Sequence, residues 1–133
     1  MILDTNHTTL IVSNLEASRR FYVEAMGMQE IPRPAAFDFQ GAWFRAGTAE
    51  LHLIHAQETL QPPGDIPPMP NQHGGPARAR HIGFTVPGVE DCVRRLAEHN
   101  IPVVAGPRPR GDGPIQLYVY DPDGHLIEFT TRP

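Results

Sequence analysis

The chain has 133 residues, a formal net charge of -4 and a sequence pI near 5.9. This length suits one compact domain, and the acidic balance argues against a protein that binds nucleic acid or an anionic membrane through basic patches. The start lacks a signal-peptide pattern and no stretch approaches the ~20 apolar residues of a membrane span, so we expect a cytoplasmic protein. The chain contains no lysine, which excludes chemistry that needs a lysine amine, and the lone Cys92 is expected to be a structural thiol.

The first half of the chain predicts one strand, one helix and two or three further strands, over residues 2–12, 13–27 and 29–54. His7 lies on the first strand, and a capping box starting at Ser13 opens the helix. We expect turns at Gly41 and Gly47. In the last strand, alternation places His52 on the face opposite its apolar neighbours.

A proline- and glycine-rich connection follows at residues 57–79, where neither a helix nor a central strand can continue, and it contains His73. The second half then predicts elements in the same order, a strand, a helix, a strand and a hairpin, at residues 81–86, 89–99, 101–105 and 116–129. Alternation in the hairpin places Glu128 among apolar neighbours. Burying a carboxylate there costs several kcal/mol of folding free energy unless it meets a cation, a metal or hydrogen-bond donors. The alternative is that Glu128 lies at a strand end and faces solvent.

The two halves also resemble each other in sequence. HTTLIVSNLEASRRFY aligns without a gap on HIGFTVPGVEDCVRRL, which places His7 on His81, and a slightly larger offset places His52 on Glu128. We therefore predict an internal duplication and an α+β fold of two tandem βαβββ modules. The modules would span about residues 1–56 and 80–133 of a single domain, with the loop 57–79 between them.

Four side chains at these symmetry-related places carry the donors that divalent transition metals prefer. His7, His81 and Glu128 would form a triad of two histidines and one carboxylate, and His52 would be either a fourth ligand or a nearby base. Each histidine taken alone is more often a surface residue, and it is the coincidence with the duplication that favours a metal site. The ion would be Fe, Mn, Ni, Co or Zn.

The duplicated modules, the histidine that opens each half and the DPDGHLIEF ending resemble the vicinal oxygen chelate superfamily, which includes glyoxalases, extradiol dioxygenases, fosfomycin resistance enzymes and bleomycin resistance proteins. The resemblance implies a divalent metal and a small-molecule substrate chelated through neighbouring oxygens. It also implies a homodimer in which His7 and His52 can come from one chain and His81 and Glu128 from the other. By the same resemblance, Glu128, His52 and Tyr118 would take part in catalysis.

Three functions stay open at this point. A glyoxalase-like lyase or isomerase is the first expectation, although glyoxalase I has an acidic residue at the place of His52. An Fe(II) extradiol dioxygenase is the second, since Tyr118 matches an assisting tyrosine of that group, and a non-catalytic drug-binding protein is the third. Some aromatic and arginine side chains are candidates for substrate contacts. The alternative is that the aromatic residues pack in the core and the arginines lie on the solvated surface. These residues are Phe37, Phe39, Trp43, Phe44, Arg78, Arg80, Arg108 and Arg110.

Overall fold

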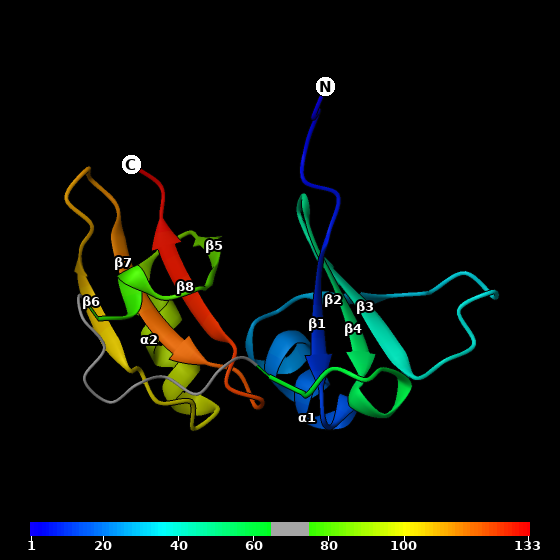
Figure 1. Ribbon diagram of the computed structural model, residues 1–133. Coiled ribbons are helices and arrows are strands. Elements are labelled where there is room, and N and C mark those ends of the chain that lie inside the picture. Colours follow the sequence, from blue (N-terminus) through cyan, green and yellow to red (C-terminus); the bar gives the residue numbers. More distant parts are fainter. Residues whose placement is uncertain (65–74) are drawn as a thin grey trace. The chain divides into compact units, whose positions relative to one another are not determined.

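The computed structural model describes residues 1–64 and 75–133, so the predicted loop residue His73 lies outside the described residues (Figure 1). The chain divides into two compact units, residues 1–64 and 65–133. Each unit contains one four-stranded sheet, with the strand orders β1-β4-β3-β2 and β5-β8-β7-β6. In both sheets the first strand pairs in parallel with the last, and the other pairs are antiparallel. The predicted α+β fold of two βαβββ modules is confirmed.

The first unit consists of β1 (Thr8–Val12), α1 (Leu15–Arg19), the π-helical η1 (Arg20–Ala25), β2 (Gln29–Ile31), β3 (Gly41–Ala46), β4 (Ala49–His55) and the short η2 (Ala56–Glu58). The cap of α1 is Asn14 rather than the predicted Ser13, because the Asn14 side chain accepts a hydrogen bond from the backbone N–H of Ala17. Gly47 occupies the expected turn with a φ of 56°. Gly41 instead begins β3, so its prediction as a turn was wrong.

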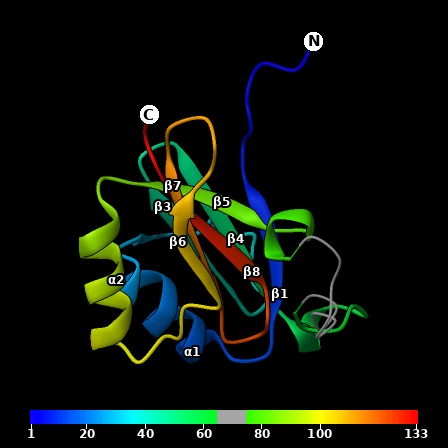
Figure 2. The same ribbon diagram turned by 90° about the vertical axis from the view of Figure 1, so that its left-hand side faces the viewer.

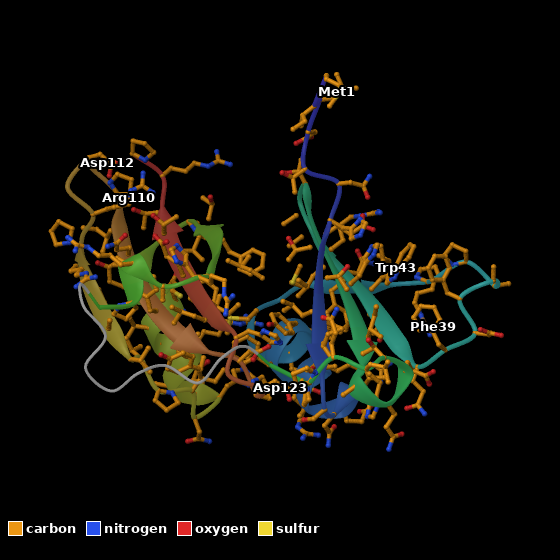
Figure 3. The ribbon with its side chains drawn as sticks, in the orientation of Figure 1. Met1, Phe39, Trp43, Arg110, Asp112 and Asp123 are labelled. Carbon is orange, nitrogen blue, oxygen red and sulfur yellow. The ribbon has the colours of Figure 1, made fainter. Side chains whose placement is uncertain are left out.

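The first strand is shorter than the predicted strand 2–12. The parallel register joins Thr8 to Leu51, and β4 begins at Ala49, so residues before Asn6 would have no partner strand. These residues extend away from the sheet, with Met1 at the tip (Figure 3). His7 therefore lies immediately before β1 rather than within a strand.

The core of the first unit lies between its helices and one face of its sheet. Phe21, Tyr22 and Ala25 of η1 are buried, and the Tyr22 ring lies 6.0 Å from that of Phe44 on β3. Phe44 is fully buried, so it belongs to this core and not to a substrate pocket. Burying such a side chain contributes about 1.5–3 kcal/mol. Because side chains alternate along a strand, His52 and Trp43 lie on the opposite face.

The second unit consists of the short η3 (Pro76–Arg78), β5 (Ile82–Val86), α2 (Val89–Glu98), β6 (Ala105–Pro109), β7 (Ile115–Tyr120) and β8 (Leu126–Thr131). α2 lies beside the sheet of its own unit and buries Leu96 (Figure 2). Within the two described ranges, no helix is both long and apolar enough to cross a membrane.

The predicted strand 101–105 was wrong in its position. The strand here is β6, which begins at Ala105 and includes Pro107 and Pro109. Proline lacks the N–H that a central strand needs, but β6 is an edge strand with a register shift between Ala105 and Arg108. The edge position therefore explains why a proline-rich segment pairs as a strand.

The predicted hairpin is present in β7 and β8. Asp121 closes its turn, since its Oδ1 accepts hydrogen bonds from the backbone N–H groups of Asp123 and His125, and Gly124 adopts a φ of 86°. The antiparallel register places Tyr118 directly opposite Glu128. This pair lies on the face that carries the predicted metal ligand.

Candidate metal centre

The first unit brings His7 and His52 together. In the parallel register Thr9 lies beside His52, and His7 precedes Thr9 by two residues, so His7 and His52 share one face of the sheet. Their rings stack with centroids 4.0 Å apart and an interplanar angle of 15°. Two of the four predicted ligands are therefore neighbours.

The second unit repeats this arrangement with His81 and Glu128. Gly83 lies beside Glu128 in the parallel register, and His81 precedes Gly83 by two residues. Nε2 of His81 is 2.9 Å from Oε2 of Glu128. The strand registers thus agree with the alignment of the two halves, in which His52 corresponds to Glu128. Within the residues described, the candidates form two pairs, and no group of three or more His, Cys, Asp or Glu side chains is placed to hold a metal.

Each candidate histidine has one ring nitrogen within hydrogen-bond distance of an oxygen acceptor outside the set of four candidate ligands. The contacts are His7 Nδ1 to Asn6 Oδ1 at 2.7 Å, His52 Nε2 to Glu50 Oε1 at 2.8 Å, and His81 Nδ1 to the Ala79 carbonyl at 2.8 Å. These oxygens only accept, so the contacting nitrogen carries the hydrogen and the other nitrogen of a neutral ring keeps its lone pair. Metal-binding histidines in proteins are held in the same way by acceptors on the non-ligating nitrogen.

The donor atoms around Glu128 fit a divalent cation. Its side chain is buried, with 7% of the residue exposed, and Oε1 has no hydrogen-bond partner among the described residues. Because Nδ1 of His81 donates to Ala79, its Nε2 and Oε2 of Glu128 would be two facing acceptors unless a proton or another cation lies between them. A metal ion would satisfy that nitrogen and the otherwise unpaired oxygen together.

Tyr118 lies beside the His81–Glu128 pair. It is 1% exposed, and its ring stands at 90° to the His81 ring with centroids 5.6 Å apart. Burial raises the pKa of the Tyr118 phenol, and the nearby Glu128 charge raises it further, against an opposing effect of Arg108. The hydroxyl therefore stays protonated near neutral pH and can donate a hydrogen bond.

A family model described as the Glyoxalase/Bleomycin resistance protein/Dioxygenase superfamily matches residues 5–129. The chain belongs to this superfamily. A lactoylglutathione lyase of Neisseria meningitidis is 30% identical over 134 residues, covering 95% of this chain and 88% of that protein. Glyoxylase I 4 of Arabidopsis thaliana is 28% identical over 125 residues, covering 93% and 68%. The solved structure of a glyoxalase/dioxygenase from Nostoc punctiforme has a TM-score of 0.75 at 28% identity, covering 98% and 91%.

Superfamily membership confirms the resemblance inferred from the sequence. Members of the glyoxalase superfamily typically use a divalent metal and act on small molecules, which agrees with the donor set described above. Two partners of this site were not assigned a role from the sequence, namely Glu50 and Arg45. The sequence did place Glu50 on the face of His52, two residues away on the same strand, and this was the available signal.

Glu50 contacts both His52 and the cross-strand Arg45, whose Nη2 lies 2.9 Å from Oε2 of Glu50. The hydrogen bond with His52 lowers the pKa of Glu50, and Arg45 lowers it further, so the carboxylate is ionised near neutral pH. Trp43 lies opposite His52 on β3, and the two rings are parallel with centroids 3.9 Å apart. In this superfamily member, the predicted ligand His52 is therefore held by polar and aromatic contacts at once.

An aromatic cluster adjoins His52 in the first unit. Phe37 lies 5.2 Å from Trp43 and 5.7 Å from Phe39 between ring centroids, and Phe37 is 39% exposed. Three of the four predicted pocket aromatics thus gather on the face of the candidate ligand. Of the predicted arginines, Arg110 is bound to Asp112 by two contacts of 2.7 Å, and Arg108 lies 6.0 Å from the centre of the Tyr118 ring.

Proposed function

We propose that this protein is a metal-dependent enzyme of the glyoxalase type, a lyase or isomerase that acts on a small oxygenated metabolite bound through two neighbouring oxygens. His7, His52, His81 and Glu128 would hold one divalent ion between them. The observation that carries the proposal is the buried Glu128 carboxylate, whose Oε1 has no hydrogen-bond partner among the described residues and whose Oε2 lies 2.9 Å from Nε2 of His81. His7 and His52 are stacked, so at least one of these rings would turn out of the stack to reach the same ion.

When bound, a divalent metal supplies a positive charge that polarises the substrate oxygens and stabilises the negative charge that develops on them. The chain's own groups supply the rest. Glu128 and His52 would move a proton, and the protonated Tyr118 hydroxyl would donate a hydrogen bond to a substrate oxygen. The aromatic cluster of Phe37, Phe39 and Trp43 would exclude water beside His52.

Similarity to a lactoylglutathione lyase at 30% identity supports the lyase or isomerase class. We do not extend the proposal to the same substrate, because His52 replaces the acidic residue that the family resemblance leads us to expect in glyoxalase I. A ring-cleaving Fe(II) dioxygenase is the second candidate. The contact of Tyr118 with the His81–Glu128 pair supports it, because the family resemblance gives the extradiol dioxygenases an assisting tyrosine at this place.

Metal content and turnover together test the proposal. Untagged protein would be loaded anaerobically with Fe(II), Mn(II), Co(II), Ni(II) or Zn(II), and the bound metal measured by plasma mass spectrometry in wild type, His52→Ala and Glu128→Ala. We expect near one metal per site in wild type and loss in both variants, with Asp38→Asn as an unaffected control. Oxygen-dependent ring cleavage of catechol by the Fe(II)-loaded protein would favour the dioxygenase, and its absence in protein that holds iron would count against the dioxygenase and leave the lyase or isomerase. Absence of metal in wild type would refute both and favour a non-catalytic binding protein.

A mixing experiment tests the proposed homodimer. If one site takes His52 from one chain and Glu128 from the other, a hybrid of His52→Ala and Glu128→Ala chains contains one intact site and one doubly impaired site. If all ligands come from one chain, the hybrid contains none. Recovery of metal binding after the two inactive variants are unfolded and refolded together would therefore support a shared site. No recovery, with a dimer seen by light scattering, would refute sharing.

A further inference from the structure

The tripeptide Pro-Arg-Pro occurs once in each module. It stands at residues 32–34 in the first module and at residues 107–109 in the second, 75 residues later. This offset lies between the offsets of 74 and 76 that align the candidate ligands of the two halves. The motif therefore belongs to the duplication, and Arg33 and Arg108 are equivalent residues.

The first copy of this arginine is closed in by its own module. Nη2 of Arg33 donates to the Phe39 carbonyl at 2.7 Å, and the guanidinium lies 5.3 Å from the centre of the Phe39 ring. Nη1 is buried against Gly41, where a Cβ would lie only 3.0 Å from it. Arg33 therefore holds the segment that carries Phe39 against the start of β3.

The second copy is not closed in. The cross-strand partner of Arg108 on β7 is Gln116, whose buried side chain fills the kind of space that Gly41 leaves beside Arg33. Arg108 is exposed, and its guanidinium carbon lies 6.0 Å from the centre of the Tyr118 ring. The same motif thus holds one arginine inside the first module and leaves the other accessible on the second.

Arg108 also differs from other arginines of its unit in its charge balance. Nη1 of Arg94 lies 2.8 Å from the Asp91 carboxylate, and Nη2 of Arg110 lies 2.7 Å from that of Asp112. Within the described part of the chain, no carboxylate lies within ion-pair distance of Arg108. Its charge is therefore available to an anionic ligand.

Arg108 lies on the face of the sheet that carries the candidate ligand. Gln116, its cross-strand partner, is two residues from Tyr118 on β7, and Tyr118 lies opposite Glu128 on β8. Burial and the Glu128 charge raise the pKa of the Tyr118 phenol, and Arg108 opposes them, so its charge acts in this part of the site. The planar guanidinium matches the two oxygens of a carboxylate with two N–H groups.

We propose that Arg108 binds the carboxylate of the substrate on the sheet face that carries His81 and Glu128. The inference rests on the proposed function in placing the substrate on this face, and it adds the substrate class, a small carboxylic acid, and the residue that selects it. A carboxylate is favoured over a phosphate, because the Glu128 charge repels a dianion more strongly than a group with one charge.

Nitrogen NMR of the metal-free protein tests this with pyruvate as the probe. Pyruvate should shift the arginine Nε–H signal that is missing from Arg108→Gln, and the backbone amide signals of β7 should give the Kd in every variant. The Kd should rise at least about 10-fold in Arg108→Gln. It should rise less in Arg108→Lys, which keeps the charge but not the planar fork. Arg94→Gln on α2 is the matched control and should leave the Kd unchanged, and inorganic phosphate should bind more weakly than pyruvate.

Two results would overturn the inference: no shift of the Arg108 signal with pyruvate, or the same Kd in Arg108→Gln as in wild type. An equal rise in Arg94→Gln would also contradict it, because the effect would then be one of overall charge. Tighter binding of phosphate than of pyruvate would overturn the assignment to a carboxylate. Failure of wild type to bind any metal would refute the proposed function, while the metal-free titration would still decide the role of Arg108.

Discussion

Glu128→Gln should separate the stability of the metal-free protein from its response to metal. The carboxylate is buried, Oε2 has one contact to His81 at 2.9 Å, and Oε1 has no hydrogen-bond partner in the described part of the chain. A buried unsatisfied acceptor costs about 1–3 kcal/mol, and a hydrogen bond to a charged group contributes about 1.5–3 kcal/mol. These opposing contributions nearly cancel. Since glutamine keeps the shape and one neutral bond, the metal-free free energy of unfolding should change by less than about 2 kcal/mol.

Metal should then distinguish the two proteins. At a concentration of about 100 times the wild-type Kd, metal stabilises the native state by about 2.7 kcal/mol. For a domain of this size that raises Tm by about 10 °C. Thermal unfolding followed by circular dichroism, with and without Zn(II), should show this rise for wild type and little of it for Glu128→Gln. The exposed Glu98→Gln on α2 is the matched control. An equal rise in Glu128→Gln would refute the ligand role.

Leu96 is 1% exposed on α2, so Leu96→Ala should lower the free energy of unfolding by about 2–5 kcal/mol in urea titrations and leave metal affinity unchanged. Asn14→Ala removes the cap of α1 and should cost about 1 kcal/mol, most of which Asn14→Ser should restore. Burial raises the pKa of the Cys92 thiol, so a disulfide reagent should react more slowly with native than with urea-unfolded protein; equal rates would contradict this. Arg110 lowers the pKa of Asp112, so the pair stabilises the fold above the ordinary carboxyl pKa, and this contribution is lost as pH falls through the lowered value. Asp112→Asn should therefore flatten the acid side of a plot of urea midpoint against pH.

The duplication made the fold and the pairing of candidate ligands predictable. Each position in one half has a counterpart in the other half, so a predicted role can be checked against a second copy. The alternation pattern of one strand offers no such check. The equivalence of His52 and Glu128 came from that comparison, and the registers Thr9 to His52 and Gly83 to Glu128 agree with it.

Contacts that depend on neighbouring strands were harder to foresee. Ala105 begins an edge strand despite the prolines that follow, and only its place at the edge of the sheet permits this. The hydrogen bond between His81 and the Ala79 carbonyl could not be predicted, because every residue has a backbone carbonyl and the sequence does not show which one His81 meets. The contact between Arg45 and Glu50 could have been predicted, because a two-residue hairpin turn starting at Gly47 places these two residues opposite each other.

The proposed ligand set also bears on the charge of the substrate. A divalent ion with His7, His52, His81 and Glu128 keeps one net positive charge, whereas a carboxylate at the place of His52 would neutralise it. Glu50 does not remove this difference, because its own charge is balanced by Arg45 at 2.9 Å. A centre that keeps a positive charge attracts anionic oxygens more strongly than neutral ones. If these four side chains hold one ion, His52 in place of an acidic residue would favour a substrate that chelates as an anion, such as a 2-hydroxy or 2-oxo carboxylate, over a neutral carbonyl compound.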